Sequence, residues 1–431
     1  MTLSCKPTPA PGHADPTRPT RDATLDVTDP ERFRHGFDHA LFRRLRQEAP
    51  VLWQDMPAHV PDAIDDGFWV VSRYADIQAI NRDTERFSAL DGPGLAVRPE
   101  MRGTMLPSMD GEAHHRLRRL VSSGFTPRMI GRLETQARAW ARHIVRDALD
   151  RERCNFVDDV AYQLPMHMIA DIMGIPISDR AALFGLVKRL LAHTDPESGI
   201  SREEAEAVRI EMFQYGQALG RDKRANPRDD VWTKLATAEI TNEAGGREAL
   251  GEIELDLFFL VLTIAGSETT RNAISLGLLA LLENPDQLAS LRGDPARLAP
   301  AAEEILRFTS PASYFARRAT RDTEIRGTTI AEGDRVTIWY PSGNRDEEVF
   351  DAPDRFDIDR ERHPHLSFGG GGHHFCLGAN LARREIEILF ETLFAHVSEI
   401  ELDGPPVYSV PGLASPVCVS LAELPVRLVG A

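Results

Sequence analysis

The sequence predicts a mainly α fold with a small β lobe, built as a single interlocked unit. Helical hydrophobic patterns dominate from about residue 112 to 320, whereas β-branched and aromatic runs beside turn residues lie near both ends of the chain. Neither an internal repeat nor a clear linker divides the chain, although 431 residues alone would allow roughly three domains. We therefore expect a small sheet assembled from both ends of the chain beside a helical body.

The N-terminal part of the chain predicts a disordered segment followed by alternating helix and strand. Residues 1–28 are rich in Pro, Thr and Asp, so we expect them to be disordered and the folded unit to span residues 29–431. Residues 37–48 predict a helix, and residues 51–53 and 68–71 predict strands. Further strands are predicted after the helical region, within residues 328–340 and 417–429.

Composition and charge exclude several classes of function. The chain is 42% hydrophobic and 27% charged, as in ordinary globular proteins, and its formal charge of −16 argues against a nucleic acid or an anionic membrane as partner. Cys5, Cys154, Cys376 and Cys418 lie far apart, which fits a reducing compartment. The N-terminus carries no apolar signal segment, and the longest apolar run, residues 257–265, is too short to span a bilayer. We therefore expect a cytoplasmic protein without a membrane anchor.

Residues 253–284 predict one helix of about 30 residues, roughly 45 Å long at 1.5 Å per residue. Near its centre Ala265 and Thr269 share a face, where small side chains would let a bulky ligand lie against the helix. Gly266 invites a local kink. Glu268 beside Thr269 offers a carboxylate and a hydroxyl, which are the parts of a proton relay. The same polar cluster is equally consistent with a helix that meets solvent at this point.

A glycine-rich loop within residues 367–378 carries a single cysteine. Four glycines precede Cys376, and a helical pattern starts just after Gly378. Glycine lets a backbone approach a flat ligand closely, and a thiol near a helix N-terminus is helped to stay deprotonated. This combination predicts one thiolate bond to a haem iron. The alternatives are an ordinary thiol, or a zinc site with His373 and His374 that lacks a fourth ligand.

Two charged pairs at helical spacing are weak signals when each is taken alone. Glu304 and Arg307 lie at positions i and i+3, and such pairs usually contribute only about 0.2–0.5 kcal/mol on a surface. His114 and Arg118 lie at i and i+4, where they would either grip an anion together or form part of a solvated basic face.

In this order the four segments resemble the cytochrome P-450 family, from about residue 30 onward. The cysteine loop resembles its haem-binding signature, and residues 265–270 resemble its oxygen-activation segment. Glu304 and Arg307 resemble its Glu-x-x-Arg pair, for which Arg355 is the expected third member. The resemblance implies the cytochrome P-450 fold, with haem between the long central helix and the cysteine loop.

One position departs from the family's pattern. The usual Phe lies seven residues before the Cys, whereas Phe368 lies eight residues before Cys376 and Gly369 takes the usual place. Either Phe368 or Phe375 would therefore pack over the sulfur.

The resemblance also implies a role for each candidate residue. Cys376 would be the axial thiolate of a haem b. Thr269 would hydrogen-bond dioxygen, and Glu268 would link it to solvent protons. The other candidates would contact the haem or its propionates; they are His114, Arg118, Ala265, Gly266, Arg317, Phe368, Gly370, His374 and Gly378.

The implied reaction is a haem-dependent monooxygenation, in which one atom of O2 enters a C–H bond of an apolar small molecule such as a steroid, terpene or branched lipid. Residues 265–275 and the cysteine loop resemble bacterial members that hydroxylate steroid side chains or methyl-branched lipids. We expect the substrate pocket to be lined by residues 91–109, 260–267, 310–315 and 417–419. The alternatives are a peroxide-driven haem-thiolate peroxygenase and a non-catalytic haem sensor or carrier.

Electrons would come from NAD(P)H through a separate ferredoxin and ferredoxin reductase, because the chain contains neither a cysteine cluster nor a spare domain for a flavin. An acidic ferredoxin would be steered to a basic patch near the cysteine, formed by Arg116, Arg119, Arg128, Arg383 and Arg384.

Overall fold

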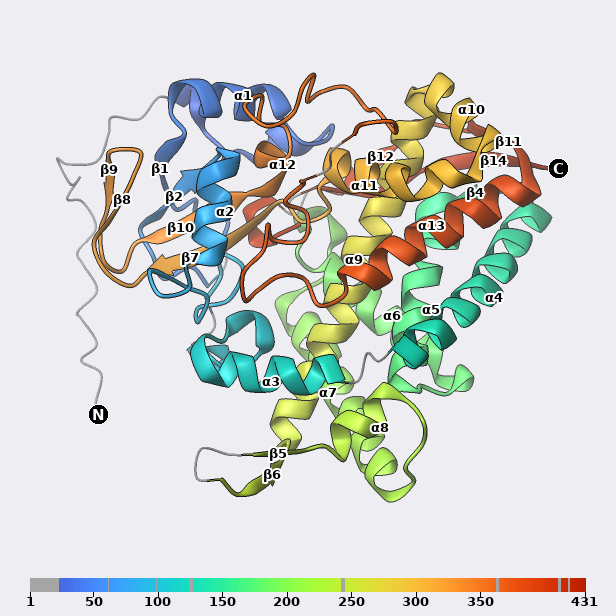
Figure 1. Ribbon diagram of the computed structural model, residues 1–431, viewed down its shortest axis with the longest axis horizontal. Coiled ribbons are helices and arrows are strands. Elements are labelled where there is room, and N and C mark those ends of the chain that lie inside the picture. Colours follow the sequence, from blue (N-terminus) through green and yellow to red (C-terminus); the bar gives the residue numbers. More distant parts are fainter. Residues whose placement is uncertain are drawn as a thin grey trace.

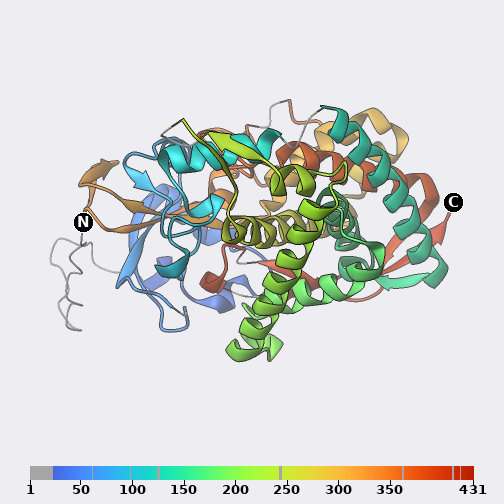
Figure 2. The same cartoon turned by 90° about the horizontal axis from the view of Figure 1, so that it is seen from below.

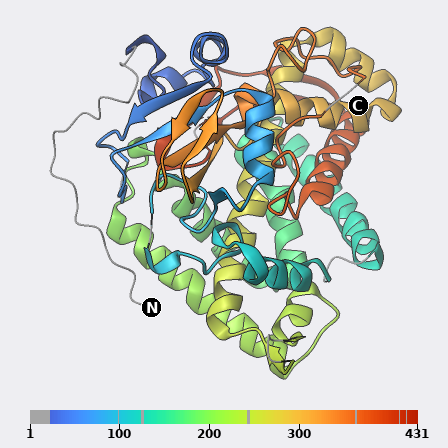
Figure 3. The same cartoon turned by 60° about the vertical axis from the view of Figure 1, so that its left-hand side comes forward.

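The fold is mainly α-helical with a β lobe on one side, as predicted (Figure 1). The computed structural model describes residues 23–60, 62–97, 99–123, 127–241, 245–361, 364–409, 412–417 and 419–431. In Figure 1 the β lobe lies at the left, with strands β1 (Val51–Asp55), β2 (Gly67–Val71), β7 (Tyr314–Ala319) and β10 (Arg335–Trp339). Figure 3 brings the blue and orange strands of this lobe forward.

The largest sheet joins segments from both ends of the chain. Its strands follow the order β1-β2-β10-β7-β3, where β3 is Phe87–Ser88. β1 pairs antiparallel with β2, β2 pairs parallel with β10, and β10 pairs antiparallel with β7. Strands β2 and β10 are buried along their whole length because both faces of the sheet are covered. The N-terminal and C-terminal parts of the chain are therefore interlocked through one sheet.

Smaller sheets accompany the large one, and the β8–β9 ribbon lies in the β lobe (Figure 1). One joins β11, β14 and β4, and the other strands form two-stranded ribbons, β12 with β13, β5 with β6, and β8 with β9. The bounds of these strands are β4 Arg153–Asn155, β5 Glu239–Thr241, β6 Arg247–Ala249, β8 Thr323–Ile325, β9 Thr328–Ile330, β11 Val397–Leu402, β12 Val407–Ser409, β13 Ser420–Glu423 and β14 Pro425–Gly430.

Helix α9 (Glu252–Glu283) passes through the centre of the helical body, as predicted for residues 253–284 (Figures 1 and 2). Its apolar residues are buried around most of its circumference, which is the pattern of a core helix. It is helical throughout, including at Gly266. It packs against α5 (Gln163–Met173), α7 (Arg202–Ala225), α11 (Leu298–Thr309) and α13 (Ala379–His396).

The other helices cover α9 and the sheet, and several begin at a side-chain cap. Asp38, Ser201 and Asp230 each accept a hydrogen bond from a backbone N–H in the first turn of the helix that follows. The bounds are α1 His39–Glu48, α2 Tyr74–Arg82, α3 Gly111–Ser123, α4 Pro127–Arg151, α6 Ile177–Ala192, α8 Val231–Ala236, α10 Pro285–Gly293 and α12 Tyr340–Gly343.

The start of the folded unit differs from the predicted boundary. Residues 1–22, most of the segment expected to be disordered, lie outside the described residues. Residues 23–25 form a short 3₁₀ helix, and Leu25 and Val27 are almost completely buried against Phe33 and Leu41. These two apolar side chains give the segment a hydrophobic contact that its Pro/Thr-rich composition does not reveal.

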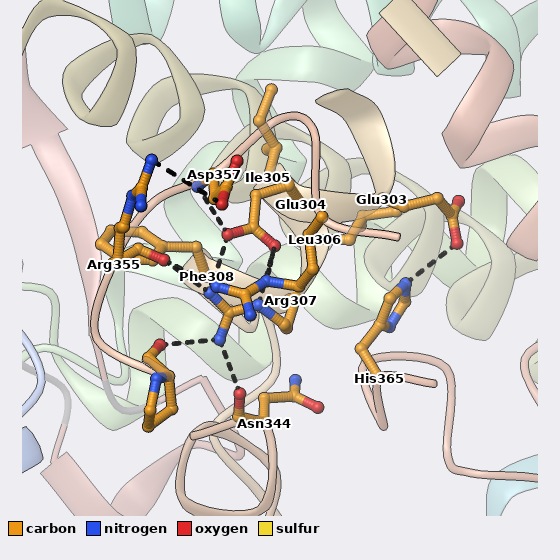
Figure 4. A network of polar contacts seen from close by, with 12 residues as sticks. Glu303, Glu304, Ile305, Leu306, Arg307, Phe308, Asn344, Arg355, Asp357 and His365 are labelled. Carbon is orange, nitrogen blue, oxygen red and sulfur yellow. Dashed lines mark hydrogen bonds and ion pairs between the residues drawn. The ribbon is translucent and has the colours of Figure 1, made fainter. Parts of the chain in front are cut away.

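A buried ion pair joins α11 to the loop that leads to the cysteine (Figure 4). Arg307 donates to both oxygens of Glu304 at 2.8 Å, and both side chains are fully buried. Arg360 Nε completes the cluster at 3.2 Å from Glu304, whereas Arg355 contributes only its carbonyl oxygen and keeps an exposed side chain. The prediction of Arg355 as the third member is therefore wrong. Arg360 takes that place because the loop residue Asp357 donates its N–H to Glu304 and turns the following residues inward.

Within the described part of the chain, the model contains no helix that combines the length and the apolar character needed to cross a membrane.

Candidate active site

An internal cavity of about 260 Å³ lies between α9, the cysteine loop and the β lobe. Most of its wall is apolar, and its basic side chains come from the cysteine loop, α3 and β7. Of the predicted site residues, it is lined by His114, Arg118, Ala265, Gly266, Thr269, Arg317, Phe368, His374, Cys376 and Gly378. Glu268 and Gly370 are not part of this wall. The structure thus brings together nearly all candidates from four separate segments of the sequence.

The four glycines before the cysteine give the loop its shape. Gly369, Gly370, Gly371 and Gly372 all have positive φ, from 65° to 106°, where a side chain would strain the backbone. A Cβ on Gly372 would also lie 2.7 Å from the carbonyl oxygen of Asn81. Gly370 therefore has a conformational role in the loop, although it does not line the cavity.

Cys376 faces the cavity at the end of this loop. Its N–H donates to the carbonyl oxygen of Phe368 at 3.0 Å, which fixes the direction of the residue. Burial raises the pKa of the Cys376 thiol, while the N–H of Gly378 and the charges of Arg118 and Arg383 act in the opposite direction. A bound cation would reverse the balance, because a coordinating thiol loses its proton.

Phe368 and Phe375 both line the cavity, which is relevant to the displaced Phe of the motif. Phe368 is buried at 8% exposure and lies under the guanidinium of Arg383, 4.5 Å from the ring centre, whereas Phe375 is 37% exposed. Phe368 is therefore the residue that the surrounding structure holds in place beside the cysteine.

Four basic residues lie on the polar side of the cavity. Arg317 is 2% exposed, and its hydrogen-bond acceptors are the carbonyl oxygen of Ala316 at 2.9 Å and Asn81 Oδ1 at 3.5 Å. Arg118 donates to the carbonyl oxygen of Phe375. Neither arginine has a carboxylate partner within the described ranges. Burial lowers the pKa of both guanidinium groups, so each would gain from an anion beside it.

The two histidines complete this basic group. His114 Nε2 is buried without a hydrogen-bond partner among the described residues, and burial with nearby His374 and Arg118 lowers its pKa to about 4. His374 Nε2 lies 3.4 Å from Asp110 Oδ1, and its ring centre lies 4.3 Å from that of His114. An unpartnered buried nitrogen of this kind fits a ligand that brings its own acceptor.

On α9, Ala265, Gly266 and Thr269 face the cavity, as their shared helical face predicts. Thr269 Oγ1 donates to the carbonyl oxygen of Ala265 at 2.9 Å. Glu268 points elsewhere and forms an ion pair with Arg271, while its Oε2 is buried without a hydrogen-bond partner in the described structure. The hydroxyl of the expected relay therefore reaches the cavity, and its carboxylate does not.

The zinc alternative does not fit the geometry. His373 Nδ1 lies 2.9 Å from His115 Nε2, and His374 is directed toward Asp110, so neither ring converges with Cys376. Among the described residues, no group of three or more His, Cys, Asp and Glu side chains could hold a metal ion.

The polar groups that line the cavity are the ones that a haem would need. Haem is a flat ring with two apolar faces and two anionic propionates, and its iron needs one axial ligand from the protein. Among the described residues, the buried Arg317 and the half-buried Arg118 have no anionic partner, the orphaned His114 Nε2 lines the same cavity, and so does one thiol. These groups would hold the propionates and the iron.

The expected substrate wall is only partly confirmed. The segments 260–267 and 310–315 supply Leu262, Pro311 and Phe315 among others, whereas Val417 and Val419, the described residues of 417–419, supply nothing to the cavity. Of the described residues within 91–109, only Leu106 and Pro107 reach it. Residues 91–97 are held on the β lobe instead, where Asp91 pairs with Arg318, Arg335 Nη2 donates to backbone carbonyls, and Ala316 N–H donates to Pro93.

The predicted basic patch is largely neutralised by ion pairs. Each described arginine of the patch has an acidic partner: Arg116 with Glu254, Arg119 with Glu112, Arg383 with Glu303, and Arg384 with Glu134 and Glu387. The side chain of Arg128 lies outside the described structure. The sequence does not reveal Glu254 and Glu303 as partners because they lie on other helices, whereas Glu387 lies at i+3 from Arg384 on the same helix.

Several residues of the wall were missed by the sequence analysis. They are mostly apolar side chains for which core packing was the simpler interpretation, namely Ile169, Ile172, Phe258, Ala273 and Leu306. Tyr340 and Glu385 are polar members of the wall that were also missed. Helical spacing could have found Glu385, because Leu381 and Ala382 lie one turn before it on the same helix.

Comparisons with known proteins agree with this geometry. The family model described as cytochrome P450 matches residues 298–404. A Mycobacterium tuberculosis protein named cytochrome P450 126 is 42% identical over 88% of this chain and 92% of its own length. A steroid C26-monooxygenase of Rhodococcus jostii is 36% identical over 90% of this chain and 82% of its own length. A methyl-branched lipid omega-hydroxylase of Mycobacterium bovis is 38% identical over 90% of this chain and 91% of its own length.

Solved structures of cytochromes P450 share this fold. The structure of a Mycobacterium marinum cytochrome P450 in complex with pseudoionone superimposes with a TM-score of 0.84 at 32% identity, covering 97% of this chain and all of the other. The similarity extends over the β lobe, the central helix and the cysteine loop alike. The chain belongs to the cytochrome P450 family of haem-thiolate monooxygenases.

Proposed function

We propose that this cytochrome P450 hydroxylates an apolar small molecule of the steroid or methyl-branched lipid class, in the cytoplasm, with electrons from NAD(P)H delivered by a separate ferredoxin and its reductase. The observation that carries the proposal is that Cys376 and Thr269 line one cavity whose remaining wall is mainly apolar. The named activities of the steroid and lipid relatives support the substrate class. Terpenes remain within the same chemical class of apolar substrates.

The chain's own residues would bind and orient the cofactor. Cys376 supplies the thiolate, and the Gly378 N–H that interacts with it tunes the electron density on sulfur. Arg118 and Arg317 would pair with the two propionates, with His114 and His374 as further hydrogen-bond partners. When bound, a thiolate-ligated haem supplies the chemistry that cleaves the O–O bond and inserts oxygen.

Thr269 and Glu268 would serve proton delivery. The Thr269 hydroxyl faces the cavity and now bonds its own helix carbonyl, a bond it can exchange for one to dioxygen or water. Glu268 would have to leave Arg271 by rotating about its side-chain bonds before it reaches the same space. Its buried, unpartnered Oε2 makes that rotation less costly than breaking a fully satisfied ion pair.

The apolar wall would select the substrate. Val261, Leu262 and Ala265 on α9 face the cavity together with Pro311, Ala312 and Phe315. A hydrocarbon chain or ring gains about 25 cal/mol for each Å² of apolar surface that it buries there. The wall offers it few hydrogen-bonding groups, so position and shape would decide which carbon is oxidised.

Ferredoxin docking would not depend on strong electrostatic attraction to the predicted arginine patch, because its described arginines are paired with carboxylates. Ion pairs with glutamates reduce the steering that these arginines would give an acidic ferredoxin. We therefore place docking on the cysteine side of the molecule with short-range contacts, and expect a weaker dependence on ionic strength than an unpaired patch would give.

The experiment is turnover of the purified holoenzyme with ferredoxin, reductase and NADPH, compared with turnover on peroxide alone. The substrates are a steroid with an alkyl side chain, a methyl-branched fatty acid and a terpene. We expect a substrate-induced spin-state shift and a hydroxylated product with at least one of the first two. In Thr269→Ala we expect haem to remain bound, product to fall by about ten-fold or more, and hydrogen peroxide release to rise.

The matched control is Thr263→Ala. Thr263 also lies on α9 and also bonds a helix carbonyl, that of Phe259 at 2.7 Å, but it does not line the cavity. Unchanged coupling in Thr269→Ala would contradict the role of Thr269. Peroxide-driven turnover faster than the ferredoxin route would favour a peroxygenase, and binding without any product would favour a carrier.

A further inference from the structure

Two pairs of adjacent histidines lie side by side next to the cavity. His114 and His115 belong to α3, and His373 and His374 belong to the cysteine loop. The ring centres are 4.3 Å apart in both contacts between the segments, His114 with His374 and His115 with His373. We call His115 and His373 the outer pair, because they do not line the cavity whereas the other two histidines do.

The outer pair is accessible from solvent. The His115 side chain is 36% exposed, and His373 is exposed as well. His115 Nε2 lies 2.9 Å from His373 Nδ1, so one ring donates and the other accepts when both are neutral. Two imidazole nitrogens from separate segments of the chain therefore meet at the surface, beside the loop that carries Cys376.

The spacing of these nitrogens suits two ligands of one metal ion. Imidazole binds a divalent transition metal through bonds of about 2.0–2.1 Å, so two nitrogens at a right angle on the metal lie about 2.9 Å apart, and two at the tetrahedral angle about 3.4 Å apart. The observed 2.9 Å corresponds to neighbouring positions of the tetragonal geometry that Cu²⁺ and Ni²⁺ prefer. Small rotations of two exposed rings would turn both lone pairs toward the ion.

Water would complete the coordination. Among the described residues, no third His, Cys, Asp or Glu side chain joins the outer pair in a possible metal site. The carboxylate of Glu112 lies 4.0 Å from Nδ1 of His115, which is the other nitrogen of that ring, and it pairs with Arg119. The outer pair is therefore separate from the zinc site with Cys376 that the geometry excludes, and it would select metals by two imidazoles alone, which favours Cu²⁺.

We propose that His115 and His373 bind one divalent transition-metal ion, Cu²⁺ most tightly, and that the ion cross-links α3 to the cysteine loop. The inference goes beyond the proposed function and does not depend on it. The ion exchanges bound water for two imidazoles and keeps its oxidation state.

The cross-link would join two segments that both line the cavity. α3 contributes His114 and Arg118 to the wall, and the cysteine loop contributes His374 and Cys376. An ion that binds only when these segments are together disfavours their separation. We therefore expect haem to leave the metal-bound protein more slowly.

The first test is isothermal titration calorimetry of the ferric holoenzyme with Cu²⁺ in a non-coordinating buffer. We expect a site in the wild type that His115→Ala and His373→Ala each weaken by about ten-fold or more. His115→Gln, which keeps a hydrogen-bonding side chain but no imidazole, should lose the site as well. A Cu²⁺ site that survives in all three variants would overturn the proposal.

His143→Ala is the matched control for this titration. The His143 side chain is 48% exposed on helix α4 and lies 3.3 Å from Asp147, so it is also an accessible helical histidine near a carboxylate. It should bind Cu²⁺ as the wild type does. Loss of the site in His143→Ala would place the ion on α4 and contradict the assignment.

X-ray absorption at the copper edge identifies the ligands without interference from haem iron. The one-to-one complex should show two imidazole nitrogens at about 2.0–2.1 Å, with oxygen at the other positions. A single imidazole would contradict the paired site. Ni²⁺ should compete more weakly than Cu²⁺, and Mg²⁺ should not compete. Effective competition by Mg²⁺ would indicate carboxylate ligands and would also contradict it.

The last test measures transfer of haem from the ferric protein to apomyoglobin, with and without Cu²⁺. Transfer should be several-fold slower with Cu²⁺ in the wild type and unaffected by Cu²⁺ in His115→Gln. A red-shifted carbon monoxide band in metal-free His115→Gln checks that its haem site is intact. Equal rates with and without Cu²⁺ in the wild type would overturn the cross-link. These results leave the monooxygenase function untouched, because turnover without added metal tests it separately.

Discussion

Glu303 links three parts of the structure around the cysteine. On α11 it accepts hydrogen bonds from His365 Nε2 at 3.2 Å and from Arg383, which lies on α13. Arg383 in turn covers the ring of Phe368, and the carbonyl of Phe368 accepts from the N–H of Cys376. The Glu303 carboxylate therefore stabilises the cysteine loop indirectly, through Arg383 and Phe368.

This arrangement predicts an acid-sensitive contribution to stability. Burial acts to raise the pKa of Glu303, but hydrogen bonds and charges from His365 and Arg383 outweigh it and lower that pKa to about 2. Because the pKa in the folded state lies below the unfolded value of 4.5, the stabilisation is fully present above about pH 4.5 and is lost as the pH falls through 2. Its upper bound is about 3 kcal/mol.

Urea unfolding at a series of pH values from about 5 to 2 measures the stabilisation that Glu303 contributes. Glu303→Gln should be less stable than the wild type at pH 5 and should lose less of its stability over this range. Glu399→Gln, at an exposed position on β11, is the control and should follow the wild type. Parallel pH curves for Glu303→Gln and the wild type would contradict this account.

Most site residues could be predicted at this scale because the chemistry of the motifs is specific. The cavity is lined, as expected, by the cysteine that follows four glycines and by the i, i+4 pair of His114 and Arg118. Glu268 did not, because each helical residue turns by roughly 100° and the neighbour of Thr269 faces another direction. Arg355 was chosen over Arg360 because two arginines in an aperiodic loop offer no basis for deciding which one turns inward.

At the scale of elements, Gly266 sets how closely α5 approaches α9. A Cβ at this position would lie 2.4 Å from Cδ1 and 2.9 Å from Cγ1 of Ile169. Ile169 itself lines the cavity. The glycine is therefore required by helix packing at the edge of the site, in addition to any contact with a ligand.

Gly266→Ala should consequently push Ile169 toward the cavity. Ala favours the helix by about 1 kcal/mol over Gly, so the free energy of unfolding should change little while the space for ligand shrinks. Titrations of the spin-state shift should show weaker binding of a bulky N-substituted imidazole, by about ten-fold, and nearly unchanged binding of imidazole itself. The second substitution Ile169→Ala should restore the bulky ligand, and equal affinity in Gly266→Ala and wild type would contradict the packing argument.

The long, strongly patterned elements were predicted well. Helix α9 and strands β1, β2 and β10 lie where the hydrophobic period placed them. Strand β7 was missed inside the region expected to be helical, because two arginines in Tyr314–Ala319 obscure its alternation. The pairs of Arg116 with Glu254 and of Arg383 with Glu303 join different elements, so sequence spacing could not predict them. Arg384 and Glu387 lie at i and i+3 on α13, and their pair could have been predicted.

At the scale of the whole molecule, the cavity is formed where the β lobe meets the helical body. The Glu304–Arg307 pair holds the segment from Asn344 to Arg360 against α11 through the contacts of Arg307 with Asn344 and of Glu304 with Arg360; Figure 4 shows the first of these contacts. Arg318 and Arg335 hold residues 91–97 on the sheet. Removing one partner of a buried pair costs about 3–5 kcal/mol, because the other charge is left buried. These contacts fix the two lobes on either side of the haem cavity.

We expect Cys376 to ligate haem as a thiolate in this cavity. The most direct measurement is the absorption spectrum of the purified protein, reduced and exposed to carbon monoxide, for the wild type and Cys376→Ser. We predict a strongly red-shifted Soret band in the wild type that is absent in Cys376→Ser. An unshifted band in the wild type, or a red-shifted band that survives in Cys376→Ser, would contradict the account.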